Sequence, residues 1–235
     1  MQYTVKVLQT TQETPTVKTI RLEKPKELSF TAGQFLMAST GFKDEKGLQV
    51  KRAYSIASAP HENFLELCIK KKPTPSFSSA LHELKVGDTL CIEGPFGKFM
   101  FKEPQKENTI LIAGGAGISP IRSMIKTMMQ KELTHKITLF YSFHSPEDYI
   151  YKKEFEDLAK QEKNFELIAT MSAKENPHPE WMGYRSRATA HLPGYIKKDK
   201  IYEVYICGPP QMVTDTVKQL LELGLAEENI HKEMW

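Results

Sequence analysis

A glycine-rich turn at residues 114–117 constrains this chain more than any other feature of its sequence. The turn follows an apolar run at residues 110–113, which has the length of a buried strand. It precedes a segment, residues 118–129, in which apolar side chains recur every three or four positions, the spacing of one helix face. Ser119 and Pro120 suit the N-cap and the first position of that helix. The sequence therefore predicts a strand, a tight turn and a helix.

A turn of this kind favours binding of a pyrophosphate. Unpaired helix N–H groups and the positive end of the helix dipole point toward it, and glycines leave room for a phosphate to approach the backbone. The dinucleotide pattern G-x-G-x-x-G is met only as G-x-G-x-x-P, from Gly115 to Pro120. The acidic residue expected about 20 residues later is missing. Taken alone, the stretch fits either a nucleotide-binding turn or a turn that binds nothing.

Composition excludes several other classes of protein. The chain has 235 residues, 40% of them hydrophobic and 26% charged, which is ordinary for a globular protein of one large or two small domains. No apolar run reaches the roughly 20 residues that span a bilayer, and the first residues lack a signal-peptide core. The three cysteines lie far apart, so neither a disulfide framework nor a metal cluster is expected. We expect a cytoplasmic protein without a metal site.

The net charge bears on possible partners. A formal charge of +3 is too small to favour nucleic acid. It would suit a ligand that carries phosphate, or an acidic protein partner. The run of lysines at residues 70–72 could meet such a partner, or it could be the solvated end of an edge strand.

The pattern of the sequence changes near residue 105. The earlier part predicts strands at residues 3–7, 17–21, 34–38, 51–57, 63–70 and 89–93 with one helix at 76–84. The later part predicts strands at residues 109–113, 136–142, 164–170 and 201–206 and helices at 119–131, 152–161 and 210–223. We therefore expect a closed antiparallel six-stranded barrel over residues 1–104, a polar linker, and a parallel doubly wound α/β domain over residues 105–235.

Residues 52–55 form a motif whose side chains could bind a ligand. Arg52 can clamp a phosphate with two hydrogen bonds. Tyr54, two residues along a strand, points to the same face and offers a ring for stacking, and Ser55 adds a hydroxyl donor. The same residues also fit a barrel strand that carries a surface arginine and a half-buried tyrosine.

Two more motifs stand near the end of the chain. Cys207, followed by Gly208 and Pro209, closes a predicted strand and places a small, soft side chain at the carboxyl edge of the sheet. It could equally be a buried cysteine before an ordinary turn. The chain ends on Glu233-Met234-Trp235. Because chain ends are usually polar and frayed, Trp235 either anchors the tail in a core or caps an aromatic ring.

Together these motifs resemble the ferredoxin–NADP reductase superfamily. The strand at residues 52–55, the Gly-Pro-Phe-Gly turn at 94–97, GGAGISP at 114–120 and CGPPQM at 207–212 stand in that family's order and spacing. The resemblance covers nearly the whole chain. It implies a six-stranded barrel that holds FAD, followed by a domain that binds NADH or NADPH.

The resemblance also implies roles for residues of the barrel. Arg52 would hold the flavin pyrophosphate, Tyr54 would stack on the isoalloxazine, and Ser55 would form a hydrogen bond near its N5. The residues that would bind FAD are Gln34, Phe35, Arg52, Tyr54, Ser55 and Ser78.

In the second domain the resemblance places the nicotinamide dinucleotide on the two turns. Cys207 would lie near the nicotinamide C4, Glu233 would order that region, and Trp235 would cover the flavin face that the nicotinamide must reach. With Ser55, these three residues would be the catalytic ones. The residues that would bind the dinucleotide are Gly114, Gly115, Gly117, Pro120, Ser172, Gly208 and Pro209.

The implied activity is transfer of hydride from nicotinamide to FAD and of electrons onward to a protein acceptor, such as an acidic ferredoxin, a flavodoxin or an oxygenase component. NADPH users of the family often place Ser-Arg after the third strand. Ser172 is followed here by Ala173, which favours NADH, although Arg185 or Arg187 could reverse this preference. Alternative functions are a flavin or ferric reductase, an electron-input subunit of a larger redox complex, and a nucleotide sensor without catalysis.

Overall fold

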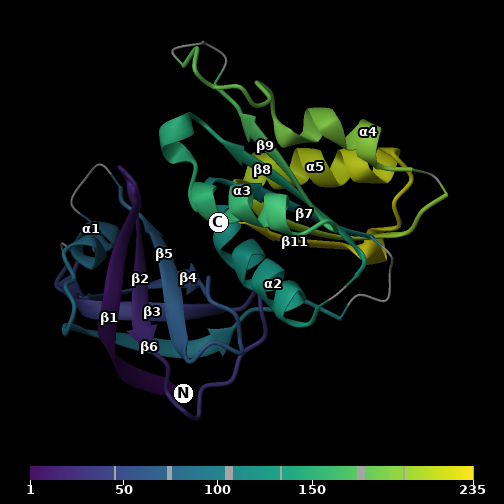
Figure 1. Cartoon of the computed structure of the whole chain (residues 1–235). Coiled ribbons are helices and arrows are strands. Elements are labelled where there is room, and N and C mark those ends of the chain that lie inside the picture. The colour runs from purple at the N-terminus through teal and green to yellow at the C-terminus, as the bar shows by residue number, and fades with distance from the viewer. Residues whose placement is uncertain are drawn as a thin grey trace. The chain divides into compact units, whose positions relative to one another are not determined.

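The chain forms two compact units in a computed structural model (Figure 1). The structure describes residues 1–44, 46–72, 76–103, 108–132, 134–173, 178–197 and 199–234. The first unit is made of Met1–Phe101 and Arg122–Lys131, and the second of Lys102–Ile121 and Glu132–Trp235. The boundary predicted between residues 104 and 105 lies outside the described residues.

The first unit contains a six-stranded antiparallel sheet, as predicted. Its elements are β1 (Gln2–Thr14), β2 (Val17–Glu23), β3 (Phe35–Lys43), β4 (Gln49–Ser55), β5 (Phe64–Lys70), helix α1 (Phe77–His82) and β6 (Thr89–Phe96). The strand order is β4-β3-β6-β1-β2-β5. Just after β4, Ile56 bridges to Leu67 of β5, and the Ala57 N–H donates to the Glu66 carbonyl at 2.8 Å. These bonds join the two edges, so the sheet closes as a barrel.

The barrel core follows the alternation of apolar residues along its strands. Ile20 and Leu22 of β2 and Leu67 of β5 are fully buried, and each such side chain contributes about 1.5–3 kcal/mol by leaving water. On β5 the alternation predicts the burial of one residue wrongly. Glu66, which the pattern would turn toward solvent, is only 4% exposed. Residues of the Arg122–Lys131 segment, which belongs to the same unit, cover it.

The second unit is a parallel sheet with helices on both faces, as predicted for a doubly wound domain. Its strands are β7 (Asn108–Gly114), β8 (Lys136–Phe143), β9 (Phe165–Met171), β10 (Tyr202–Gly208) and β11 (Ile230–Met234), in the order β11-β10-β7-β8-β9. Its helices are α3 (Lys152–Gln161), α4 (Leu192–Tyr195) and α5 (Pro210–Glu222). Helix α2 (Ile118–Gln130) begins in this unit, and from Arg122 onward it groups with the first unit. Strand β11 and helix α4 have no counterpart in the sequence prediction.

The two faces of this sheet carry different helices (Figure 1). Leu192 of α4 and Val213 of α5 belong to the same buried cluster as Ile112 and Ile206 of the sheet. On the opposite face the Tyr141 ring packs edge-on against Phe155 of α3, with centroids 6.5 Å apart. The sheet is therefore covered on both sides, which explains why its strands are continuous apolar runs.

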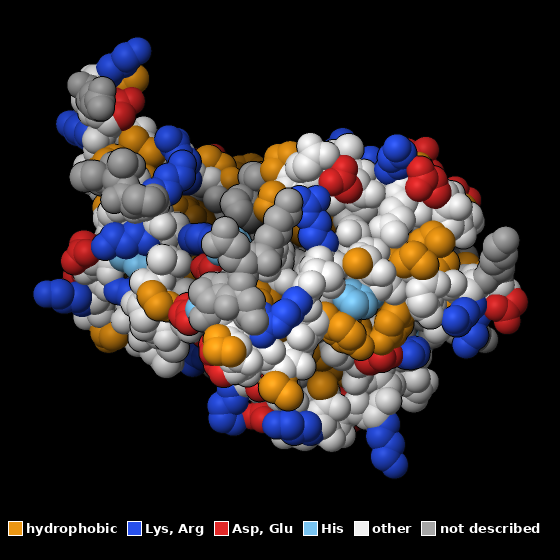
Figure 2. Space-filling model, turned by 90° about the horizontal axis from the view of Figure 1, so that it is seen from above, with side chains coloured by type: hydrophobic (Ala, Val, Ile, Leu, Met, Phe, Trp, Pro, Cys, Tyr) orange, Lys and Arg blue, Asp and Glu red, His pale blue; other side chains and the backbone are white. Residues whose placement is uncertain are grey.

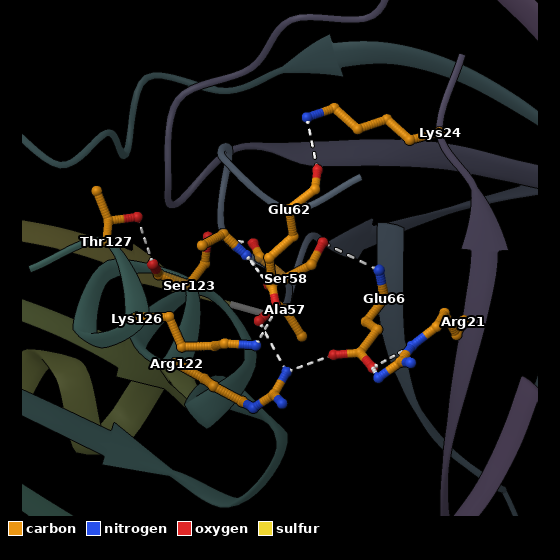
Figure 3. Close-up of polar contacts among 11 residues, drawn as sticks. Arg21, Lys24, Ala57, Ser58, Glu62, Glu66, Arg122, Ser123, Lys126 and Thr127 are labelled. Carbon is orange, nitrogen blue, oxygen red and sulfur yellow. Dashed lines mark hydrogen bonds and ion pairs between the residues drawn. The ribbon is translucent and has the colours of Figure 1, made fainter. Parts of the chain in front are cut away.

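Helix α2 differs from the prediction in two respects. A 3₁₀ turn (Gly115–Gly117) leads directly into the helix, so Ser119 is its second residue and not its N-cap. The Ser119 hydroxyl donates instead to the Ala116 carbonyl at 2.8 Å. The prediction of one apolar face is also incomplete, because Arg122 and Ser123 are buried along with the apolar residues. Polar partners from the first unit make this burial possible (Figure 3).

Gly33 and Gly87 form a matched pair for testing the packing of the first unit. Both have left-handed φ values, 102° and 94°. A Cβ on Gly33 would lie 2.2 Å from the Phe99 carbonyl oxygen, whereas a Cβ on Gly87 would meet nothing within 4 Å. We expect Gly33→Ala to lower the free energy of unfolding by about 2–5 kcal/mol, from backbone strain plus overpacking. Gly87→Ala should cost only about 1–2 kcal/mol. Equal losses in urea unfolding would contradict the packing account.

Candidate functional site

Strands β3 and β4 gather most of the residues predicted to hold FAD. In the antiparallel register Phe35 faces Ser55, Leu36 faces Tyr54, and Ala38 faces Arg52. Arg52 and Tyr54 are two residues apart, so their side chains leave the same side of β4. The structure therefore brings Phe35, Tyr54 and Ser55 to one end of this strand pair, with Arg52 in the middle of β4 on the side of Tyr54.

The side chains of β4 form a donor set that fits a phosphate and a ring. Arg52 is exposed, and the one side-chain hydrogen bond it makes within the described residues is to the Lys51 carbonyl at 2.9 Å, which leaves guanidinium donors available. Tyr54 is half-buried with its ring 6.4 Å from that of Phe77. Burial raises the pKa of Tyr54 to about 12 against the opposing effect of Arg52, so the phenol is neutral. Ser55 is also half-buried.

Two further predicted FAD residues are engaged within the protein. The Gln34 side-chain oxygen accepts from the Thr31 N–H at 2.8 Å. Ser78 is 8% exposed, and its hydroxyl accepts from the Lys72 N–H at 3.1 Å and lies 2.9 Å from the hydroxyl of Ser76, the N-cap of α1. Both side chains therefore form hydrogen bonds within the first unit. Their contact with FAD stays a prediction.

In the second unit the two predicted nucleotide turns meet at a topological switch point. The chain leaves β9 at one edge of the sheet and returns as β10 on the other side of β7. The turns after β7 and β10 are therefore neighbours at the carboxyl edge, where open α/β sheets bind ligands. A Cβ on Gly117 would lie 2.3 Å from the Cys207 carbonyl oxygen, and one on Gly114 would lie 2.4 Å from the Met212 sulfur. At Gly117 glycine is thus required by the backbone of the other turn, whereas the flexible Met212 side chain of α5 could shift away from a Cβ at Gly114.

The exposure of the first turn limits what a ligand can touch. Gly115 and the following alanine are partly exposed, whereas Gly117, Ser119 and Pro120 are buried. A ligand would therefore meet backbone at the 3₁₀ turn, and Pro120 would act only by shaping the helix start.

Cys207 and Glu233 lie side by side on β10 and β11. They face each other in the parallel register, and Gly208 faces Met234. Cys207 is 2% exposed, and burial, with a further contribution from the Glu233 charge, raises the pKa of its thiol. The thiol is therefore neutral and is no thiolate nucleophile. Pro209 is the N-cap residue of α5. Trp235 lies outside the described residues.

The segment after β9 holds the residues that bear on the choice between NADH and NADPH. Ser172 donates from its hydroxyl to the Phe143 carbonyl at 3.1 Å. Arg185 donates to the carbonyls of His178 and Trp181 at 2.7 and 3.0 Å. Arg187 lies 3.6 Å from the carboxylate of Asp215 on α5. Both arginines thus have partners within the second unit.

The sequence did not predict two ion pairs that lie near the predicted binding residues or on the helix that follows the glycine turn. Asp215 on α5 carried no signal, because its partner Arg187 is 28 positions away in the sequence. The ion pair of Glu66 with Arg122 was also missed. A charged residue inside the apolar pattern of residues 118–129 was the one hint that this helix needed a buried counter-charge.

Comparisons with known proteins agree with this architecture. Residues 4–101 match the family model "Oxidoreductase FAD-binding domain", and residues 111–218 match "Oxidoreductase NAD-binding domain". The phenol hydroxylase P5 protein of Acinetobacter pittii is 32% identical over 98% of this chain and 65% of its own length. One subunit of the Na(+)-translocating NADH-quinone reductase of Yersinia pestis is 34% identical over 76% of this chain and 47% of its own. The chain spans less than two thirds of the length of these curated relatives.

Solved structures share the fold. The ferredoxin reductase in carbazole 1,9a-dioxygenase has a TM-score of 0.84 and 27% identity, covering 100% of this chain and 69% of that one. A ferredoxin NADP+ reductase from Neisseria gonorrhoeae, with FAD and NADP bound, has a TM-score of 0.83 at 24% identity over 99% of this chain and 98% of its own. The two domain matches define the class of oxidoreductases that combine an FAD-binding domain with an NAD-binding domain. The chain belongs to the oxidoreductases with these two domains and shares the fold of ferredoxin reductases, which confirms the resemblance to the ferredoxin–NADP reductase superfamily seen in its motifs.

Two other kinds of site have no candidates among the described residues. Within them no helix has both the length and the apolar character needed to cross a bilayer. In the same part of the chain, His, Cys, Asp and Glu side chains do not gather in groups that could hold a metal ion.

Gly117→Ala tests the contact between the two turns. The added methyl group would meet the backbone of Cys207 and Gly208, which cannot move aside like a flexible side chain. We expect the free energy of unfolding to fall by about 1–3 kcal/mol, with weaker NAD+ binding and unchanged FAD content. Gly194→Ala is the control, since a Cβ there meets nothing within 4 Å. If NAD+ titration gave the same Kd, and urea unfolding the same free energy of unfolding, for both variants, the contact would be contradicted.

Proposed function

We propose that this chain takes hydride from NADH onto bound FAD and passes electrons to a protein acceptor. The observation that carries the proposal is the meeting of the glycine turn and the Cys207 turn at the switch point of the NAD-binding unit. The FAD-binding unit of the same chain supports it with the donor set on β4.

In the FAD-binding unit each β4 side chain has a task suited to its chemistry. Arg52 has free donors to bind the flavin pyrophosphate with two parallel hydrogen bonds. Tyr54, kept neutral by burial, offers a ring face to the isoalloxazine. Ser55, opposite Phe35 at the end of the strand pair, donates a hydrogen bond to the flavin edge.

In the NAD-binding unit the 3₁₀ turn directs backbone N–H groups at the dinucleotide pyrophosphate. Cys207 presents a small neutral thiol that adds no charge beside the nicotinamide ring, and Glu233 borders it on β11. When both cofactors are bound, nicotinamide supplies a hydride to the flavin, which can release electrons singly or in pairs. The reacting atoms must come within about 3–3.5 Å, so positioning is the main task of the protein.

The proposal favours NADH over NADPH. A 2′-phosphate is best bound by an arginine with free donors. Arg185 already donates hydrogen bonds to two carbonyls of its own loop, and Arg187 lies next to the Asp215 carboxylate. Asp215 would also repel the added phosphate.

The acceptor is proposed to be an oxygenase component or a small redox protein. Relatives include the reductase component DmpP of a phenol 2-monooxygenase, 31% identical over 93% of this chain and 61% of its own length. Figure 2 shows basic and acidic side chains intermingled on the face in view, without one dominant basic patch there. The similarity to the NADH-quinone reductase subunit favours a second candidate, an electron-input subunit.

Steady-state assays test the function. FAD-loaded protein should reduce ferricyanide and cytochrome c with NADH faster than with NADPH, and faster than it reduces free flavin. Reduction of free flavin as the fastest reaction would instead support the flavin reductase alternative. No reduction of any acceptor by either nucleotide would leave only a nucleotide sensor.

Arg52→Ala tests the FAD site. Loss of charge-assisted hydrogen bonds should weaken FAD binding roughly tenfold to a hundredfold, measured as flavin retained after desalting. Arg52→Lys should be intermediate, since it keeps the charge and loses the paired donors. Lys51→Ala is the control, because Lys51 pairs with Glu93 at 3.0 Å. Full flavin content in Arg52→Ala would remove Arg52 from the site.

Asp215→Asn tests the nucleotide preference. The change keeps the shape of the side chain and removes the charge that faces Arg187. We expect the NADPH-to-NADH ratio of kcat/KM to rise about threefold, a surface-pair effect. Glu222→Gln, which removes an exposed pair with Lys218 on the same helix, is the control. A ratio that stays unchanged or falls would show that Asp215 does not set the preference.

A further inference from the structure

A buried carboxylate in the first unit binds two arginines at once (Figure 3). Glu66 on β5 accepts from Arg122 at 2.7 Å through one oxygen, and from Arg21 at 2.9 and 3.0 Å through the other. Figure 3 shows the two guanidinium groups approaching the carboxylate from opposite sides. Glu66 and Arg122 are 4% and 7% exposed. Buried charges of this kind persist only when they are paired and hydrogen-bonded.

The charge state of this cluster is defined by its surroundings. Burial by itself would raise the pKa of Glu66, but Arg122 and Arg21 outweigh burial and lower the pKa below its ordinary value. The ionised carboxylate therefore compensates two positive charges. Arg122 also donates to the Ala57 carbonyl at 3.0 Å, so its guanidinium is fixed by two acceptors of the barrel.

Neighbouring side chains of helix α2 extend this attachment. Ser123 donates to the Ser58 carbonyl at 2.6 Å, and Lys126 pairs with Glu62. Arg122, Ser123 and Lys126 of α2 therefore all bind the stretch of chain from residue 57 to residue 66. These contacts explain why Arg122–Lys131 groups with the barrel, although residues 118–121 of the same helix group with the second unit.

The attached part and the nucleotide turn belong to one continuous helix. Helix α2 has 13 residues and directly follows the 3₁₀ turn Gly115–Gly117. A helix of this length measures about 20 Å and is held by its own backbone hydrogen bonds. A shift at Arg122 would therefore also move the 3₁₀ turn, which ends five residues earlier at Gly117.

We propose that Glu66 is a positioning residue for the nicotinamide dinucleotide, acting through Arg122 and helix α2 to set where the turn Gly115–Gly117 directs its backbone N–H groups. The inference rests on the proposed function, because it takes the turn before α2 as the pyrophosphate site. Glu66 touches no reacting atom in this account. It holds the helix that presents the binding groups.

Arg21 provides the matched comparison. Arg122→Met and Arg21→Met each remove one arginine from the same carboxylate, but only Arg122 lies on α2. Titration of FAD-loaded protein with NAD+ measures binding without turnover. We expect both variants to lower the thermal midpoint, and Arg122→Met alone to raise the Kd of NAD+, roughly tenfold. Glu66→Gln should behave like Arg122→Met, with unchanged FAD content.

Conservative variants keep the test decisive if a methionine variant does not fold. Arg122→Lys retains the charge and should recover most of the NAD+ affinity, whereas Arg21→Lys should bind NAD+ like the unaltered protein. Glu93→Gln, which removes the exposed pair with Lys51, is a control for the loss of a barrel carboxylate.

Equal effects of the Arg122 and Arg21 variants on the Kd would overturn the inference, because general destabilisation would then explain both. No effect of either would overturn it as well. Failure of the proposed function looks different, since the unaltered FAD-loaded protein would then bind no NAD+ at all.

Discussion

The backbone contact between Gly117 and Cys207 is the constraint on which the second unit depends. Two parallel strands that are far apart in sequence end beside each other, and their turns touch without intervening side chains. The contact fixes the position of the 3₁₀ turn next to the neutral thiol of Cys207. We propose that a dinucleotide spanning both turns would meet backbone donors at its pyrophosphate and lie beside a small uncharged side chain at its nicotinamide. The chemistry then belongs to the cofactors, and the protein supplies geometry.

The first unit relies on a different principle, the pairing of buried charge. Glu66 and its two arginines occupy a place where an apolar cluster could also pack, and such pairs are weak sources of net stability. Their directional hydrogen bonds instead define one arrangement of α2 against β5 and the segment after β4. This specificity would serve a helix that follows the turn we propose as the pyrophosphate site. The exposed donors of β4 complete the unit with groups that a bound phosphate would satisfy.

The sequence predicted the parts of the molecule that rest on local signals. Glycine and proline around residues 114–120 mark a turn wherever they occur, and the apolar runs beside them mark buried strands. Ser119 was placed wrongly because a 3₁₀ turn lengthens the helix start, which the local pattern does not encode. Strand β11 was not predicted because its sequence is mostly polar and lacks the apolar pattern of a strand. Its parallel pairing with β10 is what makes it a strand. The Glu66–Arg122 pair spans 56 positions, so no local pattern could connect it. The roles of the predicted site residues stay predictions, since they depend on FAD and a nicotinamide dinucleotide, which the sequence implies only through its resemblance to a family.

The central claim is direct transfer from reduced nicotinamide to a flavin held by this chain. The most direct measurement mixes FAD-loaded protein with NADH without oxygen and follows the flavin absorbance in a single turnover. The account predicts that the absorbance bleaches, and that NADH carrying deuterium at the transferred position bleaches it more slowly. A flavin that stays oxidised while NADH is bound in excess would contradict the account.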